Sequence, residues 1–203
     1  MTADGNNVPV HHLGVGSLDR RILRDIDLHR VGWLDDLTKA VMYVGTTIWT
    51  LAVCALVVAV VVVRLRAYRP AIAALVALVL GNLAADAGKL VFDRPRPPTA
   101  QALLEVGGAS FPSTHASMTA AVAVALVLTV RWSSGRAARL AGALLLLAVA
   151  FVGFCMVYLG AHWFSDVIAG WVLGSAIGAA VALAARRIAR PRGVSLDPSR
   201  TGR

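Results

Sequence analysis

Hydrophobic residues are gathered into five long runs along the chain, at about residues 40–63, 71–92, 114–132, 140–160 and 164–185. As an α-helix rising about 1.5 Å per residue, each run is long enough to cross the roughly 30 Å hydrocarbon layer of a bilayer. Short polar segments separate the runs. The pattern therefore predicts an all-α membrane protein, a helical bundle with five transmembrane spans.

The segment before these spans follows a different pattern. Residues 1–16 are polar and include glycine, asparagine and proline, which predicts a flexible tail. Over residues 17–38 apolar and charged positions alternate with helical spacing, so we expect an amphipathic helix on the membrane surface. A short helix packed on the bundle is the alternative. The apolar positions are Leu18, Ile22, Ile26, Trp33, Leu34 and Leu37, and the charged ones are Asp19, Arg20, Arg21, Asp25 and Asp36.

Composition supports a membrane protein. Of the 203 residues, 58% are hydrophobic and 15% are charged, with a mean hydropathy of +0.70. A soluble domain carries about a quarter charged residues. We therefore predict one membrane domain over residues 17–186, followed by a basic tail over residues 187–203. In the fifth run, glycine recurs at every fourth position, which predicts a face for close helix packing: Gly170, Gly174 and Gly178.

The distribution of basic residues predicts the topology. The formal charge is +9, and 12 of the 20 lysines and arginines follow the first, third and fifth runs. By the positive-inside rule these segments and the C-terminus are cytoplasmic, and the loops at 93–113 and 161–163 face the opposite side. Because the arginines lie between apolar runs, we expect no nucleic-acid partner. The 12 residues are Arg64, Arg66, Arg69, Arg131, Arg136, Arg139, Arg186, Arg187, Arg190, Arg192, Arg200 and Arg203.

The first polar stretch on the extracytoplasmic side is KLVFDRPRPP, residues 89–98. Ionisable groups at the end of an apolar helix are costly unless they are paired or functional. Prolines on both sides hold Arg96 in stiff, extended backbone, which suits binding of phosphate oxygens together with Lys89 and Arg94. The alternative is a snorkelling Lys89 in a salt bridge with Asp86.

The second stretch is SFPSTHAS, residues 110–117. Pro112 followed by Ser113 and Thr114 predicts a helix start, with one of the two hydroxyls as the cap. Free N–H groups at such a start attract anions, so we expect a phosphate near Ser113 and Thr114, with His115 in the first helical turn. A structural role for His115 is the alternative.

The third stretch is HWFSD, residues 162–166. His162 and Asp166 are four residues apart and share one helix face, so the carboxylate can accept from one ring nitrogen and leave the other free. A histidine oriented in this way is a candidate nucleophile or base. An interfacial histidine capped by a neighbouring acid is the alternative.

Together the three stretches resemble the type 2 phosphatidic acid phosphatase (PAP2) superfamily, whose signature is K-x6-R-P, P-S-G-H and S-R-x5-H-x3-D. The resemblance implies a metal-free and cofactor-free phosphate transfer in two steps, on a membrane lipid phosphate. It makes His162 the nucleophile, Asp166 the residue that orients it and His115 the proton donor. Full family members have six membrane helices, so segment 17–38 would stand in place of the first.

The sequence departs from the signature at two places. Thr114 replaces the glycine of the second motif, and Cys155 and Met156 replace the serine and arginine of the third. Methionine cannot replace a bidentate phosphate donor, so we expect Arg94 to cover the gap. Three readings stay open: a lipid phosphatase, a site for a phosphodiester or a sugar-linked polyprenyl phosphate, and a lipid-phosphate-binding protein with little turnover.

The lipid itself is not determined by the motifs. Phosphatidic acid, phosphatidylglycerol phosphate, polyprenyl pyrophosphate and polyprenyl-phosphoryl sugar phosphates all present a phosphate on an apolar tail. The arginine- and alanine-rich composition hints at a GC-rich genome, which favours polyprenyl lipids of the cell envelope slightly. Nothing in the sequence determines the oligomeric state.

Overall fold

The computed structural model describes residues 15–46, 56, 59–60 and 62–188 and contains no strand among them. Its helices are α1 (Ser17–Leu28), α2 (Gly32–Thr46), α4 (Tyr68–Phe92), the short 3-10 turn η1 (Thr99–Gln101), α5 (Thr114–Thr129), α6 (Gly135–Tyr158) and α7 (Phe164–Ile188). The predicted all-α class is therefore confirmed. Predicted tail residues 1–14 and 189–203, and half of the predicted first span, lie outside the described residues.

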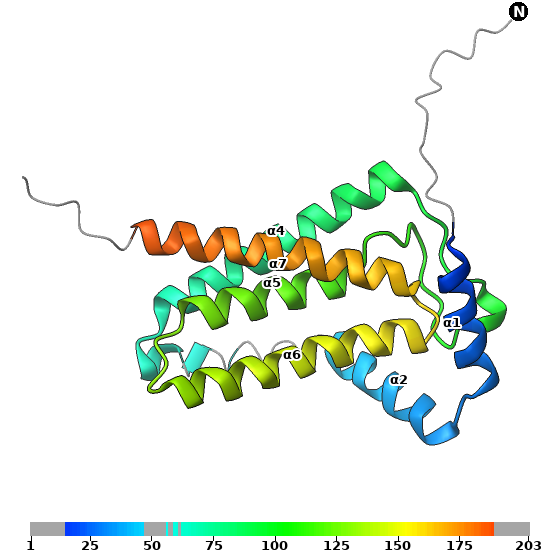
Figure 1. Cartoon of the computed structure of the whole chain (residues 1–203), viewed down its shortest axis with the longest axis horizontal. Coiled ribbons are helices and arrows are strands. Elements are labelled where there is room, and N and C mark those ends of the chain that lie inside the picture. Colours follow the sequence, from blue (N-terminus) through cyan, green and yellow to red (C-terminus); the bar gives the residue numbers. More distant parts are fainter. Residues whose placement is uncertain (1–14, 47–55, 57–58, 61, 189–203) are drawn as a thin grey trace, which may run out of the picture.

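Helices α4, α5, α6 and α7 form the bundle and run along its length (Figure 1). Three of them, α4, α6 and α7, are long and apolar enough to cross a membrane. Large apolar side chains on their outer faces are exposed, including Leu83, Leu90, Leu147 and Val172. Such an apolar exterior suits contact with lipid. The number of spans remains a prediction.

The predicted spans and the helices differ most around residue 130. Helix α5 ends at Thr129 instead of residue 132, and at 16 residues it extends only about 24 Å. Helix α6 begins at Gly135 instead of residue 140, because the side chain of Ser134 accepts a hydrogen bond from Ala137 N at 3.1 Å. A serine cap missed in the sequence therefore moves this boundary by five residues.

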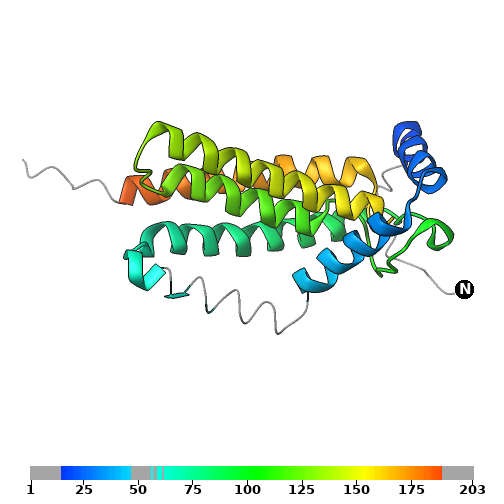
Figure 2. The ribbon, with the colours of Figure 1, turned by 90° about the horizontal axis from the view of Figure 1, so that it is seen from below.

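The prediction of one continuous helix over residues 17–38 was wrong. The chain breaks between Leu28 and Gly32, and α2 continues past residue 38 to Thr46. Helix α1 lies across the end of the bundle, and α2 slants along α6 from the same end (Figures 1 and 2). At the break, the Arg30 side chain donates to Gln101 O at 2.5 Å and Tyr158 Oη accepts from Val31 N at 3.4 Å. Helix α1 thus packs against α6 and α7, and α2 packs against α6.

The predicted glycine face on α7 is confirmed. Helices α5 and α7 have the most extensive contact in the bundle. A Cβ at Gly174 would lie 2.0 Å from Ser117 O, and at Gly178 it would lie 2.4 Å from Ala121 O. Glycine is therefore required for this approach of the two helices.

Substitution of one of these glycines tests the packing directly. We expect Gly174→Ala to lower the free energy of unfolding by about 1–3 kcal/mol, because the new methyl group overlaps the α5 backbone. Gly142→Ala on α6 is the matched control, since a Cβ there meets nothing within 4 Å. It should be neutral or stabilising by about 0.5–1 kcal/mol. Denaturant unfolding in detergent, followed by circular dichroism, measures both; equal effects would contradict the packing.

Candidate active site

A tight turn after α6 positions His162. Gly160 has φ +70°, and a Cβ there would lie 2.8 Å from Ala102 Cα. Only glycine combines that backbone conformation with this close approach. The N–H groups of Ala161 and His162 then donate to Met156 O at 3.1 and 3.2 Å. The His162 side chain is buried, with 4% of its surface exposed.

The acid of the third motif lies beside this histidine. His162 Nδ1 is 3.5 Å from Asp166 Oδ2, which is long for a hydrogen bond. The same oxygen accepts from Trp163 N at 2.9 Å, and Asp166 is fully buried in the first turn of α7. His162 and Asp166 thus face each other, with Nδ1 towards the acid and Nε2 on the other side of the ring, but the predicted hydrogen bond between them is not formed.

Arg96 lies next to the other ring nitrogen of His162, Nε2. Its Nη1 is 3.3 Å from His162 Nε2 and donates to Ala161 O at 2.6 Å. Its Nε donates to Gly107 O and Gly108 O at 3.1 and 3.0 Å. The loop carbonyls therefore hold the guanidinium in place.

Lys89 and Thr114 meet between α4 and α5. Lys89 Nζ donates to Thr114 Oγ1 at 2.5 Å and lies 3.6 Å from Asp86 Oδ1. Thr114 Oγ1 also lies 3.4 Å from Asp86 Oδ1. The salt bridge considered as the alternative for Lys89 therefore exists. Lys89 nevertheless stays close enough for its charge to act on both His115 and His162.

The second motif joins the start of α5 to the start of α7. Ser113 caps α5, since its side chain accepts from Ala116 N at 3.5 Å, and its own N–H donates to Asp166 O at 3.0 Å. His115 follows in the first turn and is partly exposed. The charges of His162, Lys89 and Arg96 act on it. The structure thus gathers the predicted groups from all three stretches.

Arg94 is placed differently from the prediction. Only 3% of it is exposed, and its Nη1 donates to Asp166 Oδ1 at 2.5 Å and to Ser165 Oγ at 2.7 Å. Its Nη2 donates to Asp19 Oδ2 at 2.7 Å. Arg94 is buried and its terminal nitrogens pair with two buried carboxylates, so this geometry does not favour the expected role of Arg94 on a substrate phosphate. Arg96, whose Nη2 donates to Ala109 O at 3.2 Å, pairs with no carboxylate of the described residues and stays partly exposed.

Met156, at the position of the family's arginine, belongs to the apolar core. Its side chain is 2% exposed and lies in a cluster with Met42, Cys155, Leu159 and Val167. Its carbonyl holds the His162 backbone, while its side chain offers no donor. Among the cations expected to bind phosphate, Lys89 and Arg96 are the two that remain partly exposed.

The sequence interpretation missed Asp19. Asp19 was assigned to the polar face of its helix, but it is buried, with 4% of its surface exposed. Its Oδ1 accepts from Ser165 N at 2.9 Å and its Oδ2 from Ser165 Oγ at 2.6 Å. The spacing could have indicated this burial. Asp19 lies four residues before the buried Leu23 and seven before Ile26, so it shares the apolar face of the helix.

Electrostatics favour a neutral His162. Burial lowers its pKa, and the positive charges of Arg96 and Lys89 lower it further, against the opposing effect of Asp166. A neutral imidazole keeps a lone pair on one ring nitrogen, as a nucleophile requires. No group of three or more His, Cys, Asp or Glu within residues 15–46 and 62–188 is arranged to hold a metal ion.

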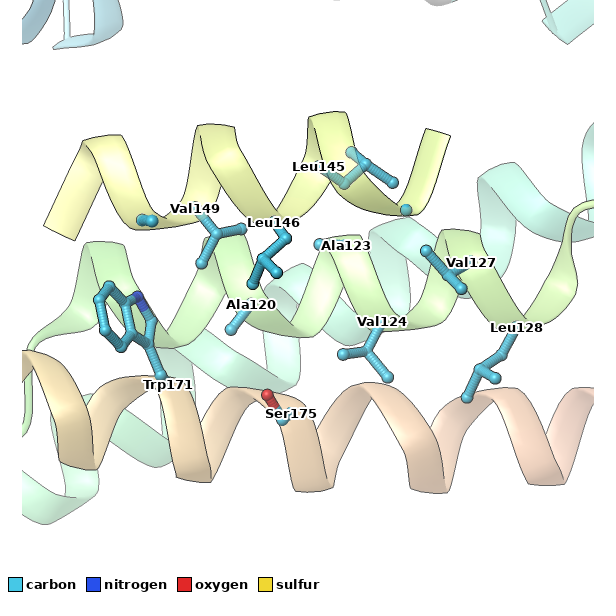
Figure 3. Close-up of a pocket in the computed structure, with 12 residues that line it drawn as sticks. Ala120, Ala123, Val124, Val127, Leu128, Leu145, Leu146, Val149, Trp171 and Ser175 are labelled. Carbon is cyan, nitrogen blue, oxygen red and sulfur yellow. The ribbon is translucent and has the colours of Figure 1, made fainter. Parts of the chain in front are cut away.

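A separate groove runs between α5, α6 and α7 (Figure 3). It has a volume of about 480 Å³ and extends from Trp171 to Leu128. Its lining is apolar apart from Ser175 and the indole nitrogen of Trp171, and it contains none of the predicted site residues. Its walls suit a hydrocarbon chain.

Comparison with known proteins identifies the family. The family model of the PAP2 superfamily matches residues 70–190, which is more than half of the chain. The chain belongs to the PAP2 superfamily. The matched residues include all three stretches that form the site.

Two solved PAP2-type structures resemble the fold. The phosphatidylglycerolphosphate phosphatase of Bacillus subtilis is 23% identical, with a TM-score of 0.72, over 87% of this chain and 88% of that chain. LpxE of Aquifex aeolicus is 22% identical, with a TM-score of 0.66, over 84% of this chain and 98% of its own. With these neighbours and its apolar helices, the chain is a membrane protein with the PAP2 fold.

One curated relative is similar over a short segment. An undecaprenyl-diphosphatase of Sulfolobus acidocaldarius is 39% identical over 69 residues. The segment covers 32% of this chain and 29% of the archaeal protein.

Proposed function

We propose that the protein is a membrane lipid phosphatase that removes a terminal phosphate from a lipid phosphate or diphosphate. The observation that carries this proposal is the position of His162, between the buried carboxylate of Asp166 and the guanidinium of Arg96. That arrangement orients one ring nitrogen and leaves the other next to a cation that binds phosphate oxygens.

In the first proposed step, the lone pair of His162 Nε2 attacks phosphorus and forms an N–P bond. The P–O bond to the leaving group breaks, and His115 donates a proton to that oxygen. Asp166 stabilises the positive charge that develops on the imidazole, whose Nδ1 keeps its proton.

In the second step, water attacks the phosphohistidine phosphorus and His115 takes a proton from that water. The N–P bond breaks, its electron pair returns to Nε2, and inorganic phosphate leaves. His162 is then ready for another cycle, and no redox change occurs in either step.

Lys89 and Arg96 supply the positive charge that phosphoryl transfer requires. In the proposed metal-free reaction they, with the N–H groups at the start of α5 after Ser113, stabilise the equatorial oxygens. The hydroxyl of Thr114 holds Lys89 in this set. Met156 contributes no cation, so the cradle depends on these two side chains.

We propose that the site faces the extracytoplasmic side. It lies at the end of the bundle near α1, whereas the segments 65–70, 128–131 and 185–186 meet at the opposite end (Figure 1). These three segments line a common cavity. That cavity includes Arg66, Arg69, Arg131 and Arg186. A basic end away from the site supports a cytoplasmic C-terminus.

A substrate panel tests the function. Phosphate release by the purified protein should occur with at least one of polyprenyl diphosphate, phosphatidylglycerol phosphate and phosphatidic acid. We would test the polyprenyl diphosphate first, because the chain is similar over a short segment to an undecaprenyl-diphosphatase. His162→Ala should lower the rate roughly 10⁴-fold or more, because the nucleophile is lost. His29→Ala is the control. It changes an exposed histidine directly after α1 and should leave the rate unchanged.

Two outcomes would contradict the proposal. If no lipid phosphate is hydrolysed while binding persists, the protein is a lipid-phosphate-binding protein. If His162→Ala releases phosphate as fast as the parent, another group is the nucleophile.

Cysteine labelling tests the orientation. A cysteine replacing the exposed Glu105, in the loop beside the site, should react with a membrane-impermeant maleimide in intact cells. A cysteine replacing the exposed Arg136, in the first turn of α6, should react only after permeabilisation. The reverse pattern would place the site on the cytoplasmic side.

A further inference from the structure

A buried chain of charged side chains connects helix α1 to Asp166, the carboxylate beside His162. Asp19 on α1 binds Arg94 Nη2 at 2.7 Å, and Arg94 Nη1 binds Asp166 Oδ1 at 2.5 Å. The three side chains are 3–5% exposed or fully buried. Asp166 in turn lies 3.5 Å from His162. Asp19 and Arg94 are therefore connected to the histidine through Asp166.

The same network fixes the start of α7. Asp19 accepts hydrogen bonds from both the N–H and the hydroxyl of Ser165, which precedes Asp166. Arg94 also donates to the Ser165 hydroxyl, at 2.7 Å. Its guanidinium lies 5.9 Å from the ring centroids of both Phe111 and Trp163. The position of Asp166 is thus fixed both by Arg94, which binds it directly, and by Asp19, which binds the preceding Ser165.

The number of charges has a chemical consequence. Arg94 alone against Asp166 would form a neutral pair and weaken the interaction of the carboxylate with a cationic imidazole. Asp19 adds a second carboxylate to the same guanidinium. Two negative charges and one positive charge leave the network with one excess negative charge, which stabilises positive charge on His162.

We propose that Asp19 and Arg94 are positioning residues of the catalytic site, which fix the orientation of Asp166 and tune the charge that His162 experiences. The inference rests on the proposed function of His162 and Asp166. It assigns helix α1 a part in the reaction, in addition to any contact with the membrane surface.

Replacing Asp19 and replacing Arg94 should shift the pKa of His162 in opposite directions. Asp19→Asn keeps the shape of the side chain and removes a negative charge, so it should lower the pKa of His162. Arg94→Gln removes a positive charge and should raise it. The other charged or titratable groups that act on the imidazole are Asp166, Arg96, Lys89 and His115, and both variants leave them unchanged. A merely structural role predicts no such opposite pair.

The titration of His162 measures this directly. In ¹⁵N-histidine-labelled protein in micelles, His162 is assigned from the spectrum of His162→Ala. Relative to the parent, the midpoint of its titration should fall by roughly half a pH unit or more in Asp19→Asn and rise by a similar amount in Arg94→Gln. Asp25→Asn and Arg24→Gln, exposed positions on α1, are the charge-matched controls and should shift it much less.

Kinetics give a second readout. With a hydrolysed lipid phosphate, Asp19→Asn should lower kcat by about 10- to 100-fold, as loss of an outer partner of an active-site histidine does. KM should change by less than about twofold, since Asp19 touches no substrate. Rates are expressed per folded molecule, so that loss of folded protein does not imitate loss of kcat.

Several results would overturn the inference. Unchanged titration and kcat in Asp19→Asn would do so, as would midpoints that move in the same direction in both variants. If Arg94→Gln alone does not fold, the double variant Asp19→Asn/Arg94→Gln is compared with Asp19→Asn. In that comparison Arg94→Gln must raise the midpoint of the His162 titration. A parent that hydrolyses nothing refutes the proposed function, whereas the titration still tests the coupling.

Discussion

The site is organised around one buried carboxylate. Asp166 has no solvent contact, and a charge in that position is tolerated only if it is paired and hydrogen-bonded. Trp163 N–H and the Arg94 guanidinium meet this requirement, and His162 lies at the remaining side. Segments from the α4–α5 loop, the α6–α7 turn and α1 therefore converge there because each supplies or supports a partner of this charge.

The bundle makes that convergence possible. Glycines on α7 let it lie directly against α5, so the first turns of the two helices meet, and Ser113 N–H donates to the Asp166 carbonyl. The turn at Gly160 then places His162 beside Asp166. Close helix packing thus sets the distance between the second and third motifs, and with it the geometry proposed for phosphate transfer.

Much of the fold and of the candidate site was predictable from local sequence patterns. Apolar runs predicted the helices, and motif spacing predicted which side chains gather at one end. Long-range pairing was not predictable: Asp19 and Arg94 are 75 residues apart, and the sequence favoured Asp19 as a surface acid and Arg94 as a phosphate ligand. A charged residue in an amphipathic segment is assigned to water unless its buried partner is known, which only the tertiary structure provides.

The whole proposed mechanism depends on His162, positioned by Asp166, as the nucleophile. The most direct measurement mixes the protein with its hydrolysed lipid phosphate, radiolabelled in the terminal phosphate, stops the reaction in alkali within milliseconds and maps the label by mass spectrometry. We expect a phosphorylated histidine at position 162 that forms before phosphate is released. Label on another residue, or release with no labelled protein at any time, would contradict it.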